Sequence, residues 1–217
     1  MPPLQILIAD DHAIVRKGLK IVVNELFPDC ICDEACNGDD IFFLIKKTRY
    51  NLLILDINMP FTDSVALVSN LLVHQKETRI LVFSMNAEDL YAKRFLKLGA
   101  KGYLHKDCQP EEIKKAIRII LDGKIYMSQQ LNERLMNEML TESTANPFEK
   151  LSDRELEIVR YFLLGYSVTD IKKTLNIHAS TIGTYKMRLF EKLKIKTALE
   201  LSDLAVLYNM NFTGKKV

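Results

Sequence analysis

Short apolar runs alternate with amphipathic segments along the first 121 residues of the chain. Buried parallel strands have near-continuous apolar runs, whereas amphipathic helices repeat apolar residues every three or four positions. The runs predict five strands, at residues 4–9, 31–35, 51–57, 79–83 and 102–104. The segment after each run has helical spacing, first seen in Val15, Leu19, Val22 and Leu26. Five such units in a row predict an α/β domain with a five-stranded, doubly wound parallel sheet.

The rest of the chain lacks any strand pattern. Residues 122–150 contain a helical stretch at 130–140 and a polar, proline-terminated stretch at 141–147, which predicts a partly helical linker. Residues 151–217 have a helical period throughout and predict a second, smaller, all-α domain of four helices. Three sequences in it have the spacing of helix capping boxes: Ser152 with Glu155, Ser167 with Asp170, and Thr197 with Glu200.

Composition narrows the class of protein. Of 217 residues, 48% are hydrophobic and 27% are charged, which is typical of globular domains. No apolar run approaches the ~18 residues of a membrane helix and no secretion signal is visible, so we expect a cytoplasmic protein without membrane contact. Residues 150–217 carry 12 Lys or Arg against 7 Asp or Glu, a net charge of +5, while residues 1–149 carry 18 against 21, or −3. The basic part indicates a module that binds a polyanion, or else a solvated surface.

The four cysteines match no common pattern. Cys30, Cys32 and Cys36 are close together and Cys108 is distant. This spacing is neither that of a paired C-x-x-C zinc site nor that of a secreted disulfide framework. We expect reduced thiols, with a metal or redox site as the alternative.

Acidic residues follow two predicted strands directly. Asp10 and Asp11 come after the first strand and Asp56 after the third. Ligands of a doubly wound sheet bind outside the carboxyl ends of its strands, so we expect these carboxylates to lie together. Three clustered carboxylates repel one another unless a cation neutralises them. Mg²⁺ takes oxygen ligands and keeps positions open for phosphate oxygens, so the pattern predicts Mg²⁺ as cofactor and phosphoryl chemistry as function.

Ser84 and Lys106 end two further strands of the same sheet. Asp56 is the candidate nucleophile, because an aspartyl carboxylate can accept a phosphoryl group covalently. Lys106 would bind one phosphoryl oxygen and the Ser84 hydroxyl another. A single Asp or Lys at a strand end is more often a loop residue or a helix cap, and the joint placement is what favours a site.

Taken together, these positions resemble the flavodoxin-like receiver domain of two-component response regulators. The resemblance covers residues 1–121 and rests on five separated positions in the same order: Asp10-Asp11, Asp56-Ile57-Asn58-Met59-Pro60, Ser84, and Gly102-Tyr103-Leu104-His105-Lys106. It implies that a sensor histidine kinase phosphorylates Asp56 and that the main-chain carbonyl of Asn58 joins Asp10, Asp11 and Asp56 as a metal ligand. Enzyme activity beyond this self-phosphorylation and its reversal is not expected.

The resemblance also implies that Ser84 and Tyr103 form a switch pair, in which the hydroxyl moves to the phosphoryl group and the ring turns into the vacated space. A static strand aromatic is the alternative for Tyr103. The sequence departs from the family at Ser64, where Gly is usual, and Ser would be strained there if the position needs a positive φ. Asn58 and Asn86 lie where the family tunes dephosphorylation.

Residues 168–175, 176–179 and 180–193 have the pattern of a helix, a tight turn and a second helix. Ile182, Leu189 and Leu193 would face the core. The candidate DNA contacts on the second helix are Thr181, Thr184, Tyr185, Lys186, Arg188 and Lys192. Basic side chains suit phosphates, and residues near the start of such a helix can reach base edges in the major groove, although a merely solvated basic face is the alternative.

This segment resembles the LuxR-type helix-turn-helix of the NarL/FixJ response regulators over about residues 150–209. The supporting residues are Leu151-Ser152-Asp153-Arg154-Glu155, Gly165-Tyr166-Ser167, Ile171, Leu175, Ile177, Thr181-Ile182, Lys192-Leu193 and Glu200-Leu201. The chain departs from the family at Lys172, His178 and Gly183. We expect Gly183 to make no DNA contact or to permit close approach of the backbone.

The last helix has an apolar stripe of Leu201, Leu204, Ala205 and Tyr208. The resemblance implies a two-fold contact there, and packing within the domain is the alternative. The leading hypothesis is a transcription regulator, switched by phosphorylation, that binds double-stranded DNA as a phosphorylation-promoted homodimer, with RNA polymerase as a further candidate partner. The alternatives are a phosphorylation-independent DNA-binding or scaffold protein and a metal-dependent phosphohydrolase.

Overall fold

The computed structural model describes residues 3–60, 62–140, 146–208 and 210. The chain forms two compact units, Met1–Met139 and Leu140–Val217. Within the described residues, no helix is long and apolar enough to span a lipid bilayer.

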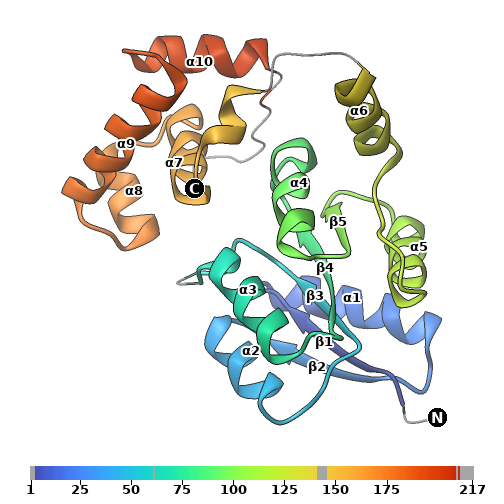
Figure 1. Ribbon diagram of the computed structural model, residues 1–217. Helices are drawn as coiled ribbons and strands as arrows, with labels where there is room; N and C mark the ends of the chain where they lie inside the picture. The colour runs from blue at the N-terminus through green and yellow to red at the C-terminus, as the bar shows by residue number, and fades with distance from the viewer. Residues whose placement is uncertain (1–2, 61, 141–145, 209, 211–217) are drawn as a thin grey trace. The chain divides into compact units, whose positions relative to one another are not determined.

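The described part of the first unit contains one parallel sheet with the order β2-β1-β3-β4-β5. Its strands are β1 (Gln5–Ala9), β2 (Ile31–Ala35), β3 (Leu52–Leu55), β4 (Arg79–Ser84) and β5 (Gly102–His105). The helices that follow them are α1 (Ala13–Leu26), α2 (Gly38–Ile45), α3 (Ser64–His74), α4 (Glu88–Leu98) and α5 (Pro110–Leu121). The predicted fold class is confirmed (Figure 1).

Helices cover both faces of this sheet (Figure 1). α1 and α5 pack on one face, where Val23 and Ile117 lie in the same core cluster as Ile6 and Ile8 of β1. α2, α3 and α4 neighbour one another on the opposite face. Since both faces are covered, β3 is buried along its whole length, which is why its sequence is apolar at every position.

The segment after α5 packs against the edge of the sheet. Tyr126 is buried, and its N–H donates to the carbonyl of Lys101 at 2.8 Å beside Gly102. A Cβ atom at Gly102 would lie 3.2 Å from the Tyr126 Cβ, so glycine permits this close approach. α6 (Gln129–Leu140) follows, where the sequence predicts a helix. Part of the range predicted as linker, 122–150, therefore packs on the first unit.

The second unit is helical throughout its described residues. A short 3₁₀ helix, η1 (Pro147–Lys150), precedes α7 (Asp153–Leu163), α8 (Val168–Leu175), α9 (Ala179–Leu193) and α10 (Ala198–Leu207). Reciprocal capping boxes begin α7 at Ser152 and α8 at Ser167, as predicted. The prediction of a third capping box is wrong in one respect. The Thr197 side chain caps α10, but the Glu200 carboxylate accepts from the N–H of Lys196 and not from that of Thr197.

Candidate functional site

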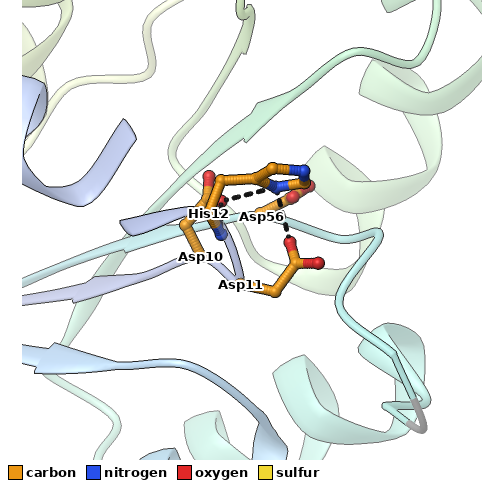
Figure 2. Close-up of side chains that lie close together, drawn as sticks. All are labelled: Asp10, Asp11, His12 and Asp56. Carbon is orange, nitrogen blue, oxygen red and sulfur yellow. Dashed lines mark hydrogen bonds and ion pairs between the residues drawn. The ribbon is translucent and has the colours of Figure 1, made fainter. Parts of the chain in front are cut away.

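The predicted acidic site forms at the carboxyl ends of β1 and β3. Asp10 directly follows β1 and Asp56 directly follows β3, and both are almost fully buried. Figure 2 shows Asp10, Asp11, His12 and Asp56 turned toward one another. One ligand atom from each of these four residues lies within 4.8 Å of the others. The strand order reverses between β1 and β3, which is where such sheets bind ligands.

Lys106 directly follows β5 and brings a positive charge into this cluster. Its Nζ lies 2.6 Å from Asp10 Oδ2 and 2.7 Å from Asp56 Oδ2. Burial alone would lower the pKa of Lys106, but the carboxylates of Asp56 and Asp10 outweigh it and raise the pKa. The ammonium group is therefore held charged between two buried acids.

Burial raises the pKa of Asp56 above its ordinary value, and Lys106 opposes this rise. The main-chain N–H of Asn58 also donates to Asp56 Oδ1 at 3.0 Å. Hydrogen bonds from an ammonium and an amide to the two carboxylate oxygens fix the orientation of the group. An oriented carboxylate with little water around it is suited to attack on a phosphorus atom.

The residues present fit a hard divalent cation. Three carboxylates converge and supply oxygen atoms, the ligands that Mg²⁺ prefers. Lys106 neutralises only part of this negative charge. Asp10, Asp11 and Asp56 would hold the ion, and the Asn58 carbonyl stays a predicted fourth ligand.

Two residues at the site were not predicted from the sequence. His12 Nδ1 lies 2.8 Å from Asp11 Oδ1. Arg16, one turn into α1, donates from Nη1 to the main-chain carbonyl of Asp10 at 2.7 Å and from Nε to Glu34 at 3.0 Å. The bond from Arg16 holds the pKa of Glu34 below its ordinary value. The only signal in the sequence was their nearness to the acidic pair.

Ser84, at the end of β4, lies in a hydrogen-bond network with two asparagines. The Asn58 amide donates to Ser84 Oγ at 3.0 Å, and the Asn86 amide donates to Asn58 Oδ1 at 3.0 Å. Tyr103 is fully buried, and its hydroxyl donates to the carbonyl of Asn86 at 2.9 Å. The predicted switch pair is thus connected through the loop after β4, with the tyrosine ring inside the protein.

Ser64 does not carry the strain considered from the sequence. It is the first residue of α3, and its φ is not among the positive values of the described residues. Its hydroxyl donates to the carbonyl of Ile57 at 2.7 Å. The serine therefore fastens the loop that follows Asp56 instead of distorting it.

The second unit places the predicted helix-turn-helix at α8 and α9. Asn176 has a φ of 50° and ends α8 in the left-handed region. Ile182, Leu189 and Leu193 of α9 are buried, as predicted. His178 stands at the capping position of α9, and its side chain makes no capping hydrogen bond within the described residues.

The predicted DNA contacts on α9 differ in their surroundings. Thr181 and Tyr185 are half-buried, and the other four are exposed: Thr184, Lys186, Arg188 and Lys192. Lys192 Nζ lies 2.6 Å from Glu155, a carboxylate that is 3% exposed. The Lys186 ammonium group lies over two aromatic rings of the same unit, 5.7 and 5.3 Å from their centroids.

The stripe predicted as the dimer contact is largely internal. Leu201 and Ala205 of α10 are buried within the unit, so their side chains have almost no surface to offer a second chain. Leu204 is half-buried, and the half-buried ring of Tyr208 packs edge-on against Phe148. A dimer contact on α10 stays a prediction, and the large exposed apolar side chains of this helix are Leu199, Val206 and Leu207.

Comparison with known protein families agrees with the acidic site of the first unit and with the helix-turn-helix of the second. Residues 6–118 match the response regulator receiver domain, and residues 149–205 match the bacterial regulatory proteins of the luxR family. The oxygen regulatory protein NreC of Staphylococcus epidermidis is 32% identical over 94% of this chain and 97% of its own. The response regulator UvrY of Escherichia coli is 26% identical, with 95% of each chain covered.

A solved structure shares the fold. RcsB of Salmonella enterica serovar Typhimurium, bound to the promoter rprA in the presence of the phosphomimetic BeF3-, has a TM-score of 0.64 and 25% identity over 94% of this chain and 98% of its own. The order of the two matched segments, a receiver followed by a LuxR-type helix-turn-helix, is that of one family. The chain belongs to the NarL/FixJ family of two-component response regulators, which bind DNA.

Proposed function

We propose that a sensor histidine kinase phosphorylates Asp56 in the presence of Mg²⁺ and that this modification controls the binding of double-stranded DNA by the second unit. The observation that supports it most is Lys106, whose Nζ lies within 2.7 Å of Asp56 and 2.6 Å of Asp10. A buried lysine between two buried acids fits the binding of a further anionic group beside Asp56.

The proposed transfer forms a bond between an Asp56 carboxylate oxygen and phosphorus while the bond from phosphorus to the kinase's histidine nitrogen breaks. The leaving imidazole takes up a proton. Lys106 stabilises negative charge on the phosphoryl oxygens, and the acids at 10, 11 and 56 hold the ion. The Mg²⁺ ion supplies further charge neutralisation when bound.

The network around Ser84 then responds. For the Ser84 hydroxyl to donate to a phosphoryl oxygen, its bond from the Asn58 amide has to weaken. Asn86 is hydrogen-bonded both to Asn58 and to the Tyr103 hydroxyl, so a shift of the loop after β4 would change the position of the tyrosine ring. The result is a biased equilibrium between two arrangements of α4 and β5.

DNA binding is assigned to α9, and a phosphorylation-promoted homodimer would double the contacts with DNA. We place the two-fold contact at Leu199, Val206 and Leu207 of α10, because these apolar side chains are exposed. RNA polymerase remains a further candidate partner. RcsB has been solved with DNA, which supports the assignment by similarity.

The test incubates the protein with acetyl phosphate and Mg²⁺ and measures phosphoryl incorporation by intact mass. The wild type should gain one phosphoryl group, and Asp56→Ala should gain none. Asp39→Asn, at an exposed acid in the first turn of α2, is the matched control and should react like the wild type. Equal incorporation by the wild type and Asp56→Ala would refute the proposal.

A further inference from the structure

The exposed face of α9 is fixed by the residues that the helix buries. Ile182, Leu189 and Leu193 point into the unit. At 3.6 residues per turn, the positions opposite them lie on the solvent side. The exposed residues there are Ser180, Gly183, Thr184, Met187, Arg188 and Glu191.

The two lysines of α9 have partners inside the unit. Lys192 pairs with the buried carboxylate of Glu155, which also accepts from the N–H of Ser152. The Lys186 ammonium group lies near the rings of Phe162 and Phe190. Arg188 is the basic residue on the face opposite the buried ones, and Lys186 and Lys192 are exposed on the flanks of the helix.

Met187 is the one large apolar side chain among these six exposed residues. Met187 is 71% exposed. One turn earlier, the Thr184 hydroxyl donates to the carbonyl of Ser180 at 3.0 Å, so its hydrogen is used within the helix. At Gly183, four residues before Met187, an added Cβ would meet nothing within 4 Å, so the surface beside the methionine is open.

We propose that Met187 is a specificity-determining residue that contacts the C5 methyl group of a thymine in the major groove. The inference rests on the proposed binding of DNA through α9. Thymine is the base that presents a methyl group in the major groove, and apolar side chains read it by contact. The flexible, polarisable thioether of methionine suits such a contact, and Gly183 allows the helix to approach closely.

The experiment selects binding sites from random double-stranded DNA with the full chain, acetyl phosphate and Mg²⁺. A selected site is then synthesised with thymine or with uracil, which lacks only the methyl group. The wild type should bind the uracil version about fourfold more weakly for each methyl contacted, the equivalent of one buried CH₂ group. For Met187→Ala the ratio between the two versions should fall to about one, since a truncated side chain makes no such contact.

The matched control is Met136→Ala, which truncates a methionine that is 64% exposed on α6. It should keep the wild-type ratio between thymine and uracil sites. Circular dichroism and thermal unfolding establish that Met187→Ala is folded. If Met187→Ala keeps the same ratio as the wild type, or if the selected sites contain no thymine, the inference is overturned. A wild type that enriches no sequence would instead contradict the proposed function.

Discussion

At the scale of single residues, the role of a lysine depends on which buried carboxylate lies beside its ammonium group. Lys106 is enclosed by Asp10 and Asp56, so its charge is held within the acidic site. Lys192, whose side chain is 41% exposed, pairs with the buried carboxylate of Glu155, although the sequence favours it as a DNA contact. The sequence predicts that both lysines bind phosphate oxygens, and the fold distinguishes them by the acids that it places beside each.

Lys192→Met is predicted to destabilise the second unit by about 1–3 kcal/mol at neutral pH, because it leaves a buried carboxylate without its charged donor. The value should lie near the lower end, since the Lys192 side chain is 41% exposed and solvent screens the pair. Urea unfolding followed by circular dichroism measures the change, with Lys173→Met of α8 as an exposed control. Unchanged stability together with a salt slope of DNA binding reduced by about one would show that Lys192 contacts phosphate.

The contribution of the Lys192–Glu155 pair to the stability of the second unit should depend on pH. Burial raises the pKa of Glu155, but the bonds from Lys192 and Ser152 outweigh it and lower the pKa. A lowered pKa adds stability that is present above the unfolded value and is lost as the pH falls through the folded value. Lys192→Met removes the largest of the interactions that lower the pKa of Glu155, so the difference in stability between variant and wild type should shrink in acid. A difference that is constant with pH would contradict the assignment.

The positions of the candidate site residues in the receiver could be predicted because the apolar pattern of each strand shows where the strand ends. Asp10, Asp56, Ser84 and Lys106 each lie at the end of a strand, and parallel strands bring those ends together. The contacts of Arg16 with Asp10 and Glu34 could not be predicted, because they depend on how α1 lies beside β2. The positions of strand ends follow from topology, whereas side-chain partners require packing.

At the scale of elements, the edge of the sheet accounts for the weakest predicted strand. β2 lies at one edge, and Ile31 is exposed there, so its pattern is less apolar than that of β3. β3 is shorter than the predicted run at 51–57, because the chain leaves the sheet at Asp56 to present its carboxylate. In both cases the departure from a regular strand pattern follows from the position of the strand in the sheet.

The other edge gives a prediction at Gly102. An added Cβ would lie 2.8 Å from Ile120 Cδ1 and 3.2 Å from Tyr126 Cβ, so Gly102→Ala should destabilise the first unit by about 1–3 kcal/mol through overpacking. Gly18→Ala is the control, because it lies exposed in α1 with nothing within 4 Å of the new Cβ. That change should stabilise by about 0.5–1 kcal/mol. Thermal unfolding compares the two, and equal shifts would contradict the packing described.

α10 gives a prediction for assembly. Val206 is 78% exposed, so Val206→Glu should leave the fold intact and weaken the proposed dimer by placing like charges at a two-fold contact. Sedimentation velocity in the presence of the phosphodonor measures the dimer fraction, and Val73→Glu, at an exposed valine of α3, is the control. Identical dimer fractions for the wild type and Val206→Glu would show that the two-fold contact does not lie at this position of α10.

At the scale of the whole molecule, the chain divides its tasks between two units. The first contains the acidic site and the second contains the helix-turn-helix. The sequence indicates this division through the change from strand-helix alternation to helices alone. It places the end of the first domain at residue 121, whereas Tyr126 still packs beside Gly102, because a single tyrosine after α5 carries no periodic signal.

Coupling between the units is the central claim. The most direct measurement is the affinity for a selected DNA site, with and without acetyl phosphate and Mg²⁺, for the wild type and for Asp56→Asn. The wild type should bind at least about tenfold more tightly with the phosphodonor, since a dimer engages two half-sites at once. Asp56→Asn should bind with the same weak affinity in both conditions. A wild type that binds DNA equally with and without the phosphodonor would contradict the account.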